Sequence, residues 1–275
     1  MKKHIILESI AETFLLIKQY KLLVLALFIL QILFFSVLAF VQLNYHVAIA
    51  GNLASISDYF DNLDLNDEAV AEKLSNKGSI LGMPDVYKSY DVIVKSLKGL
   101  VIATFLIFAV LNGINWAFTD YLINRKNIKE FFTYLWKFVL LTFLHGSIIL
   151  VLILTFIKVS FADLMTEGNA GFGIAALILG VAVLYFMFIS FALAGKTKLR
   201  NIFKRAFMIG TKKAGAVILA YLINIAFVDL LFFLLYIVID VSFWLLLLMT
   251  LLFFFSFIPA RIFLILVVNR LDKDL

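Results

Sequence analysis

Ionisable and amide side chains interrupt the apolar stretches of this chain, and these positions are where its chemistry would lie. Asp229 is the most informative of them, because it lies about fifteen residues into an apolar stretch, or roughly 22 Å along a helix. A carboxylate in hydrocarbon costs about 2.5–3.5 kcal/mol, so it should face protein or water. Asp229 is therefore either an ion relay, proton relay or substrate contact, or a neutral side chain hydrogen-bonded to a neighbouring helix. We expect the second.

Arg261 is the next such position, and it follows Pro259 in the last apolar stretch. Proline removes a helical hydrogen bond and leaves local backbone groups to be satisfied in other ways. The two residues predict either a kinked site that binds an anion or an acidic group, or an arginine that snorkels to the cytoplasmic interface. We expect the second. An ion pair with Asp229 is not expected, because the two residues differ in depth by roughly 15 Å on straight helices.

His145 and several amides form a third group of polar positions within apolar stretches. A single histidine in a chain without cysteine is a poor metal site, and we expect a buried, neutral side chain with one hydrogen bond to another helix. The amides are expected to join helices, at around 0.6 kcal/mol each. The sequence therefore indicates no catalytic residue, no metal ligand and no cofactor. One hypothesis stays open, which is a shared polar pocket at comparable depth formed by Gln31, Asn112, His145, Asn224 and Arg261.

An unbroken apolar run at residues 22–41 indicates which elements position these side chains, because about 20 apolar residues span a bilayer as a helix. The chain of 275 residues is 64% hydrophobic and only 15% charged. Soluble domains are roughly 25% charged. We predict an all-α, polytopic membrane helix bundle that forms one transmembrane domain, residues 1–275. Its six spans are expected at residues 22–44, 99–118, 138–156, 172–193, 214–237 and 243–268.

Lysine and arginine are unevenly distributed over the connections, and this predicts the orientation. They gather in the N-terminal segment, in the second and fourth connections and in the tail. The positive-inside rule then places both termini in the cytoplasm and the chain in a prokaryotic cytoplasmic membrane. The basic segment 195–213 is too short for nucleic-acid binding and instead predicts contact with anionic lipid headgroups. The residues expected to make this contact are Lys198, Arg200, Lys204, Arg205, Lys212 and Lys213.

Amphipathic segments precede the first, third and fifth spans, and each has apolar residues at helical spacing. The second segment begins at Ile128, and the third has Ile202, Ala206 and Ile209 on one side. We expect each to lie as an interfacial helix in the headgroup plane. A unit of interfacial helix, span, outer turn and span would then occur three times. The apolar stripe of the first segment, residues 1–21, consists of Ile6, Ile10, Phe14 and Ile17.

The outer region, residues 45–98, is expected to form a small helical cap, because about 50 residues cannot bury much core. Within it a short helix is predicted at residues 66–74, and another is predicted to begin at Pro84 and run into the second span. Trp116, Trp136 and Trp244 are expected at the membrane interfaces. Small residues four apart predict close helix packing within the chain. They are Ala109, Gly113 and Ala117, then Ala176 and Gly180, then Ala216 and Ala220.

One stretch carries a resemblance to a known family. It reads KLRNIFKRAF at residues 198–207 and GTKK at residues 210–213, and it leads into an apolar span. The stretch resembles uncharacterised six-span prokaryotic membrane proteins related to the membrane domain of glycerophosphodiester phosphodiesterases. The resemblance implies a membrane-embedded accessory or transport-like role, and no active residue can be transferred from it.

Three classes of function therefore remain. The first is a non-enzymatic accessory or transport-like membrane component, which acts alone or with a protein partner in the membrane. The second is the permease subunit of an export-type ABC transporter, which resembles this chain in size and span number but has its elaborated outer segment between the last two spans. The third is a membrane-embedded enzyme, for which only Asp229, His145 and Arg261 are available, at different depths.

Overall fold

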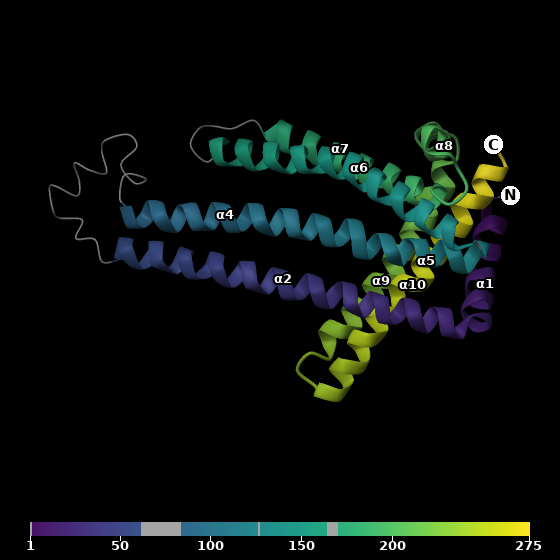
Figure 1. Cartoon of the computed structure of the whole chain (residues 1–275), viewed down its shortest axis with the longest axis horizontal. Coiled ribbons are helices and arrows are strands. Elements are labelled where there is room, and N and C mark those ends of the chain that lie inside the picture. The colour runs from purple at the N-terminus through teal and green to yellow at the C-terminus, as the bar shows by residue number, and fades with distance from the viewer. Residues whose placement is uncertain (1, 62–83, 126, 164–169) are drawn as a thin grey trace. The chain divides into compact units, whose positions relative to one another are not determined.

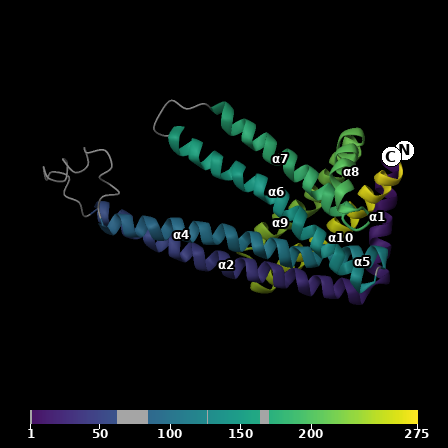
Figure 2. The same ribbon diagram turned by 45° about the horizontal axis from the view of Figure 1, so that its top comes forward.

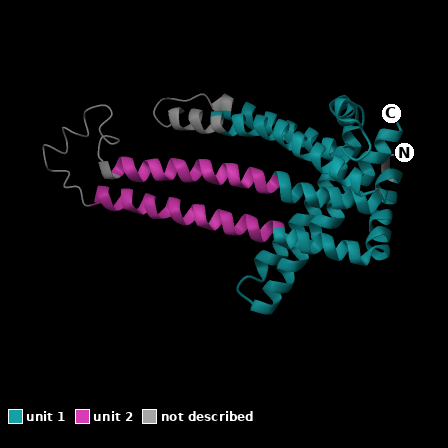
Figure 3. Cartoon of the chain, viewed as in Figure 1, with its two compact units in different colours: residues 1–33, 109–275 teal, residues 34–108 magenta. Residues whose placement is uncertain are grey.

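The computed structural model of the chain describes residues 2–61, 84–125, 127–163 and 170–275, and all regular elements within them are helices. The chain divides into two compact units (Figure 3). Unit 1 consists of residues 1–33 and 109–275, and unit 2 consists of residues 34–108. The all-α fold predicted from the sequence is confirmed for the described part of the chain.

Unit 1 contains most of the helices. In this unit α6 packs along α7 and α9 packs along α10, and the α6–α7 pair runs side by side in both views (Figure 1, Figure 2). The two chain termini lie at the same end of the unit (Figure 1). The helices are α1 Lys2–Gln19, the start of α2 Lys21–Asp61, α5 Gly113–Asn124, α6 Ile128–Asp163, α7 Ala170–Leu193, α8 Leu199–Lys212, α9 Ala214–Ile237 and α10 Phe243–Lys273.

Within the described residues, six helical segments are long and apolar enough to cross a membrane. Each contains the core of one predicted span, so the predicted number of spans is confirmed. The chain is therefore an integral, multi-pass membrane protein. The segments are Lys21–Asp61, Val86–Asn124, Ile128–Ile153, Gly173–Leu193, Ala214–Ile237 and Phe243–Lys273.

Unit 2 consists of the second part of α2 and of α4, Pro84–Ile107. The two helices approach closely where the ring of Tyr45 lies over Gly99, at a position that a Cβ atom would occupy. The described residues resume at Pro84, and the chain is helical from there, in agreement with the predicted helix. The α4 helix leads into a π-helical turn, η1 Phe108–Asn112, which precedes α5.

The described start of the outer region differs from the predicted cap, because residues 45–61 continue α2, which has 41 residues, or about 60 Å of helix. Residues 84–98 belong to α4 and run into the second span, as predicted. No proline interrupts residues 45–61, and the polar side chain of Asn52 donates to the Ala48 carbonyl of its own helix at 2.8 Å. Polar residues therefore extend the helix past the apolar run. The predicted helix at 66–74 lies outside the described residues.

The amphipathic segment before the third span is the first part of α6 and not a separate helix. Asn127 caps this helix, because its Oδ1 atom accepts a hydrogen bond from the Glu130 amide at 3.0 Å. An N-cap residue followed by Glu at the third helical position is a strong start signal. No residue between Ile128 and the predicted span start at Phe138 breaks the helix. Within the described residues, separate helices therefore precede the first and fifth spans but not the third, and their placement in the headgroup plane stays a prediction.

The first interfacial helix, α1, is joined to α2 at Tyr20 and packs on α10. Its buried positions are Ile6, Ser9 and Thr13, while Phe14 of the predicted stripe is 66% exposed. Apolar side chains on its outer side are suited to lipid, whereas Ile6 and the small polar side chains of Ser9 and Thr13 face the protein. Ion pairs of Arg270 with Glu8 and Glu12, at 3.1 and 2.6 Å, attach the helix to the end of α10.

The second interfacial helix, α8, has the amphipathic pattern that the sequence predicts. Ile202, Ala206 and Ile209 are all buried, as expected for one face of a helix. That face lies against protein and not lipid, because a Cβ atom at Gly210 would meet Phe186 and Tyr185 of α7. The Tyr185 hydroxyl donates to the Gly210 carbonyl at 2.9 Å.

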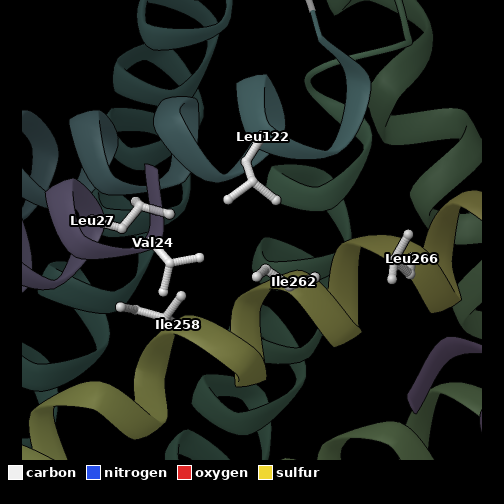
Figure 4. Close-up of a cluster of buried hydrophobic side chains, with 6 residues drawn as sticks. All are labelled: Val24, Leu27, Leu122, Ile258, Ile262 and Leu266. Atoms are coloured by element: carbon white, nitrogen blue, oxygen red, sulfur yellow. The ribbon is translucent and has the colours of Figure 1, made fainter. Parts of the chain in front are cut away.

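The core of unit 1 is built around α10. All residues from 261 to 269 are buried. An apolar cluster joins the start of α2, the end of α5 and the second half of α10, and its side chains point toward one another (Figure 4). These residues are Val24, Leu27, Leu122, Ile258, Ile262 and Leu266.

A second core consists of aromatic rings from α5, α6 and α7. Trp116 lies with its ring centroid 6.2 Å from Phe138 and 5.6 Å from Phe191, and the last two rings stack at 4.1 Å. Such aromatic pairs add about 0.5–1.5 kcal/mol each beyond the area that they bury. Trp116 is therefore a buried core residue, whereas Trp136 and Trp244 are exposed. The positions of the three tryptophans at the membrane interfaces stay predictions.

Close packing at small residues is confirmed on two of the three helices. Ala109, Gly113 and Ala117 are buried in the second span, and Ala216 and Ala220 are fully buried in α9. A Cβ atom at Gly113 would lie 2.9 Å from Cδ1 of Phe138 and 3.0 Å from Cδ1 of Leu135. On α7 the prediction is wrong for Gly180, because a Cβ atom there meets nothing within 4 Å.

These two glycines make a matched test of the α5–α6 contact. Gly180→Ala should raise the stability by up to about 1 kcal/mol, because alanine is the better helix former and the site is open. Gly113→Ala should lower it by about 1–3 kcal/mol, because the new methyl group overlaps Phe138. Unfolding of the purified variants in detergent measures both effects. Equal stabilities for the two variants would contradict the packing described.

Candidate functional site: a buried polar centre at Arg261

The second half of α10 carries the polar centre of unit 1. Pro259 lies inside this helix and has no amide hydrogen to donate. Side chains donate to backbone carbonyls on either side of it. Arg261 Nε donates to the Phe257 carbonyl at 3.1 Å, and Asn224 Nδ2 of α9 donates to the Ala260 carbonyl at 2.9 Å. The region around the proline is thus tied by side-chain hydrogen bonds within α10 and to α9.

The Arg261 side chain points into the protein, and the snorkelling interpretation is not what the structure shows. Its guanidinium Nη2 atom donates to the side-chain oxygen Oε1 of Gln31 on α2. Arg261 is 7% exposed and Gln31 is 2% exposed. The pair therefore forms a buried contact between the first and last spans within unit 1.

The positive charge of Arg261 has no acidic partner. Within the described residues it forms no ion pair with any carboxylate, and both of its bonded acceptors are neutral oxygens. The remaining nitrogen, Nη1, is buried and has no hydrogen-bond partner. An unpaired buried donor costs about 1–3 kcal/mol, and more when it is charged. One nitrogen of a buried cation is therefore left without an acceptor.

Asn115 of α5 is a second buried polar side chain without a partner. It is fully buried, and neither its amide nitrogen nor its carbonyl oxygen forms a hydrogen bond. The same holds for the side-chain amide of Asn269 on α10 and for the hydroxyl of Thr142 on α6. Buried polar groups without partners are rare in native proteins, and each calls for an explanation.

Two residues of the hypothetical shared pocket, His145 and Asn112, form no hydrogen bond with Arg261. His145 Nδ1 lies 2.8 Å from the Leu141 carbonyl of its own helix, and its ring stacks on Phe203 of α8 at 5.6 Å. It is a buried histidine, as expected, but its hydrogen bond stays within one helix. Asn112 is half-buried at the end of the π-helical turn η1. Gln31 and Arg261 are hydrogen-bonded to each other, and Asn224 bonds to the backbone carbonyl of Ala260, next to Arg261 in the chain.

Asp229 lies on the outside of α9 and does not join helices within the described part of the chain. Its side chain is exposed and makes no hydrogen bond or ion pair there. The expected bond to a neighbouring helix is therefore not formed in this unit. Five residues earlier on the same helix, Asn224 makes the bond to α10 that was expected of Asp229.

Three further polar residues stand out in the structure but not in the sequence. The Tyr134 hydroxyl of α6 donates to the Phe191 carbonyl at 2.8 Å. One turn later, Lys137 Nζ donates to the carbonyls of Ala194 and Thr197, at 3.0 and 2.9 Å. These bonds satisfy carbonyls at the end of α7, where a helix has no partners of its own.

The third of these residues, Asp120 of α5, is 2% exposed. It accepts a hydrogen bond from Asn124 at 2.7 Å and lies against Gly195, where no Cβ atom would fit. The i, i+3 spacing of Tyr134 and Lys137 is the one sequence signal that could have indicated these bonds. Polar residues are common near span ends, so this spacing does not stand out.

The basic residues proposed to contact lipid lie at or next to α8. Lys198, Arg200, Lys204 and Lys212 are exposed, and Lys213 is half-buried. Arg205 forms an ion pair with Asp272 at 2.7 Å and so ties α8 to the end of α10. The contact of the four exposed residues with lipid headgroups stays a prediction.

The described residues contain no group of three or more His, Cys, Asp or Glu side chains that could hold a metal ion. The polar centre at Arg261 contains no nucleophile paired with a base. It can bind a polar or negatively charged group through a guanidinium, but it does not assemble the parts of a hydrolytic site. No protein-family profile, curated protein or solved structure matches the chain.

The contrast between Asp229 and Asn224 can be measured by substitution. Asp229→Leu should leave the unfolding temperature in detergent unchanged or raise it, because no interhelical bond is lost and leucine is far better suited to an apolar surface. Asn224→Leu should lower the stability by about 0.5–2 kcal/mol, because the bond to Ala260 is lost. A large loss of stability in Asp229→Leu would show that this carboxyl does hold helices together.

Proposed function

We propose that the chain is a non-enzymatic, transport-like membrane component that handles a polar or charged solute at the Arg261 centre. The observation that carries the proposal is the burial of the Arg261 guanidinium with one nitrogen unpaired. Ionisable residues within membrane spans are costly, and they typically mark solute or ion pathways. The bond from Arg261 to Gln31 joins the first span to the last, so the centre is positioned by two helices.

The placement of the other ionisable groups supports a non-enzymatic role. An enzyme needs its acid, base and nucleophile within hydrogen-bond reach of one another. Here His145 stacks on α8, Asp229 lies outside α9, and Arg261 faces α2. The accessory or transport-like role implied by the resemblance of residues 198–213 agrees with this proposal.

The same proposal includes a location and an orientation. We place the chain in the cytoplasmic membrane of a prokaryotic cell, with both termini and α8 on the cytoplasmic side. The distribution of lysine and arginine supports this orientation. The exposed lysines and arginines of residues 198–212 would then face anionic lipid headgroups.

Transport can be tested with the purified chain in liposomes. Vesicle swelling in a panel of small neutral, cationic and anionic solutes should show at least one solute that enters faster than into empty vesicles. Arg261→Gln should abolish that entry, whereas Lys129→Gln, at an exposed position of α6, should not. Entry that is the same in Arg261→Gln as in the parent would refute a pathway through this centre. An ATPase that copurifies and is required for entry would favour the permease class instead.

The orientation can be tested in cells, because the chain has no cysteine of its own. A cysteine in place of Ser57, on the exposed extension of α2, should react with a membrane-impermeant maleimide in intact cells. A cysteine in place of Asn201, on the exposed side of α8, should react in inverted membrane vesicles alone. The reverse pattern would show that the termini face outward.

A further inference from the structure

We infer that the Nη1 atom of Arg261 binds a small anion as the counterion of this buried guanidinium. The inference rests on the proposed function and gives its solute a chemical class, a small singly charged anion. The site consists of Arg261 on α10 and Gln31 on α2, which hold the guanidinium in place.

The first step of the argument is that the charge cannot be removed. A buried lysine or histidine can lose its proton when no partner is present, but the guanidinium of arginine keeps its charge in proteins. Arg261 is 7% exposed, so bulk water does not stabilise this charge. The cation therefore needs a negative partner within the protein or a bound one.

The second step is that no carboxylate among the described residues is bonded to this guanidinium. The Phe257 carbonyl and the Gln31 amide oxygen are both neutral. No carboxylate among the described residues forms an ion pair with Arg261, and Asp229 lies exposed on another helix. A glutamate at position 31 would have balanced the charge in the same space, yet the residue there is the neutral amide.

The third step concerns size. Nε and Nη2 each donate to a protein oxygen. A carboxylate therefore cannot form its usual pair of hydrogen bonds with these two nitrogens. The one nitrogen without an acceptor is Nη1. This atom is enclosed by the protein, so only a small group can lie against it. The site therefore suits a halide ion or a single anionic oxygen, which inorganic phosphate or a lipid headgroup could also offer.

The test is the unfolding temperature of the purified chain in neutral detergent at constant ionic strength. Sodium gluconate, a large anion, is replaced stepwise by sodium chloride, and separate arms add inorganic phosphate or phosphatidylglycerol. The parent chain should show a saturable rise, about 5–10 °C at a hundredfold excess over Kd. The arm that gives the rise identifies the source of the anion.

Three variants make the result specific. Arg261→Gln should lose the rise, and Lys129→Gln, which removes one exposed positive charge elsewhere, should keep it. Gln31→Glu supplies a built-in carboxylate at the atom that now accepts from Nη2, so it should be more stable than the parent in gluconate and should not respond to the anion. This variant keeps the test valid even when Arg261→Gln does not fold.

The result that overturns the inference is the absence of a rise in the parent in every arm, or a rise that persists unchanged in Gln31→Glu. The proposed transport is judged separately by solute entry into liposomes. Anion binding without entry would support the counterion site and contradict transport. Entry of a solute without anion binding would support transport and contradict the counterion site.

Discussion

The second half of α10 is enclosed by other helices, and this burial governs how unit 1 is assembled. All residues from 261 to 269 are buried, and α1, α5, α7, α8 and α9 pack against α10. In a bilayer, apolar side chains gain little by leaving lipid for protein, so close packing and satisfied polar groups hold helices together. Arg261 bonds to α2, the Ala260 carbonyl accepts from α9, and Arg270 pairs with α1. The polar groups of one helix thus connect three others.

The helical spans could be predicted from the sequence because lipid imposes a minimum length on an apolar run. Where each helix ends could not, since a polar residue does not end a helix. Residues 45–61 and 128–137 continue α2 and α6 past the predicted boundaries. The breaks occur where the backbone itself changes, as at Arg125, whose φ of 48° places it in the left-handed region and ends α5. Arg125 also lies over the Tyr20 ring, at 4.9 Å.

The candidate site could be predicted in part. Gln31, Asn224 and Arg261 stand out because polar residues are rare within apolar runs, but the meeting of Gln31 and Arg261 spans 230 residues and depends on tertiary packing. Lys137 escaped notice for the opposite reason. A basic residue near a span end ordinarily serves orientation, and nothing in the local pattern reveals that its ammonium group is bound to the end of another helix. The role of a polar residue can thus be predicted from the sequence within an apolar run, where such residues are rare, but not near a span end, where they are common.

The central position of α10 has a consequence for biosynthesis. Chains are made from the N-terminus, so among the described helices the one that most others pack against is made last. Until it arrives, α1, α5, α7, α8 and α9 lack their common partner, and the Gln31 side chain lacks the arginine to which it binds. The earlier helices can form the aromatic core of α5, α6 and α7 before that step, but the apolar cluster around α10 cannot form. Unit 1 is therefore completed only when α10 joins it, and a chain that stops before α10 would lack that cluster.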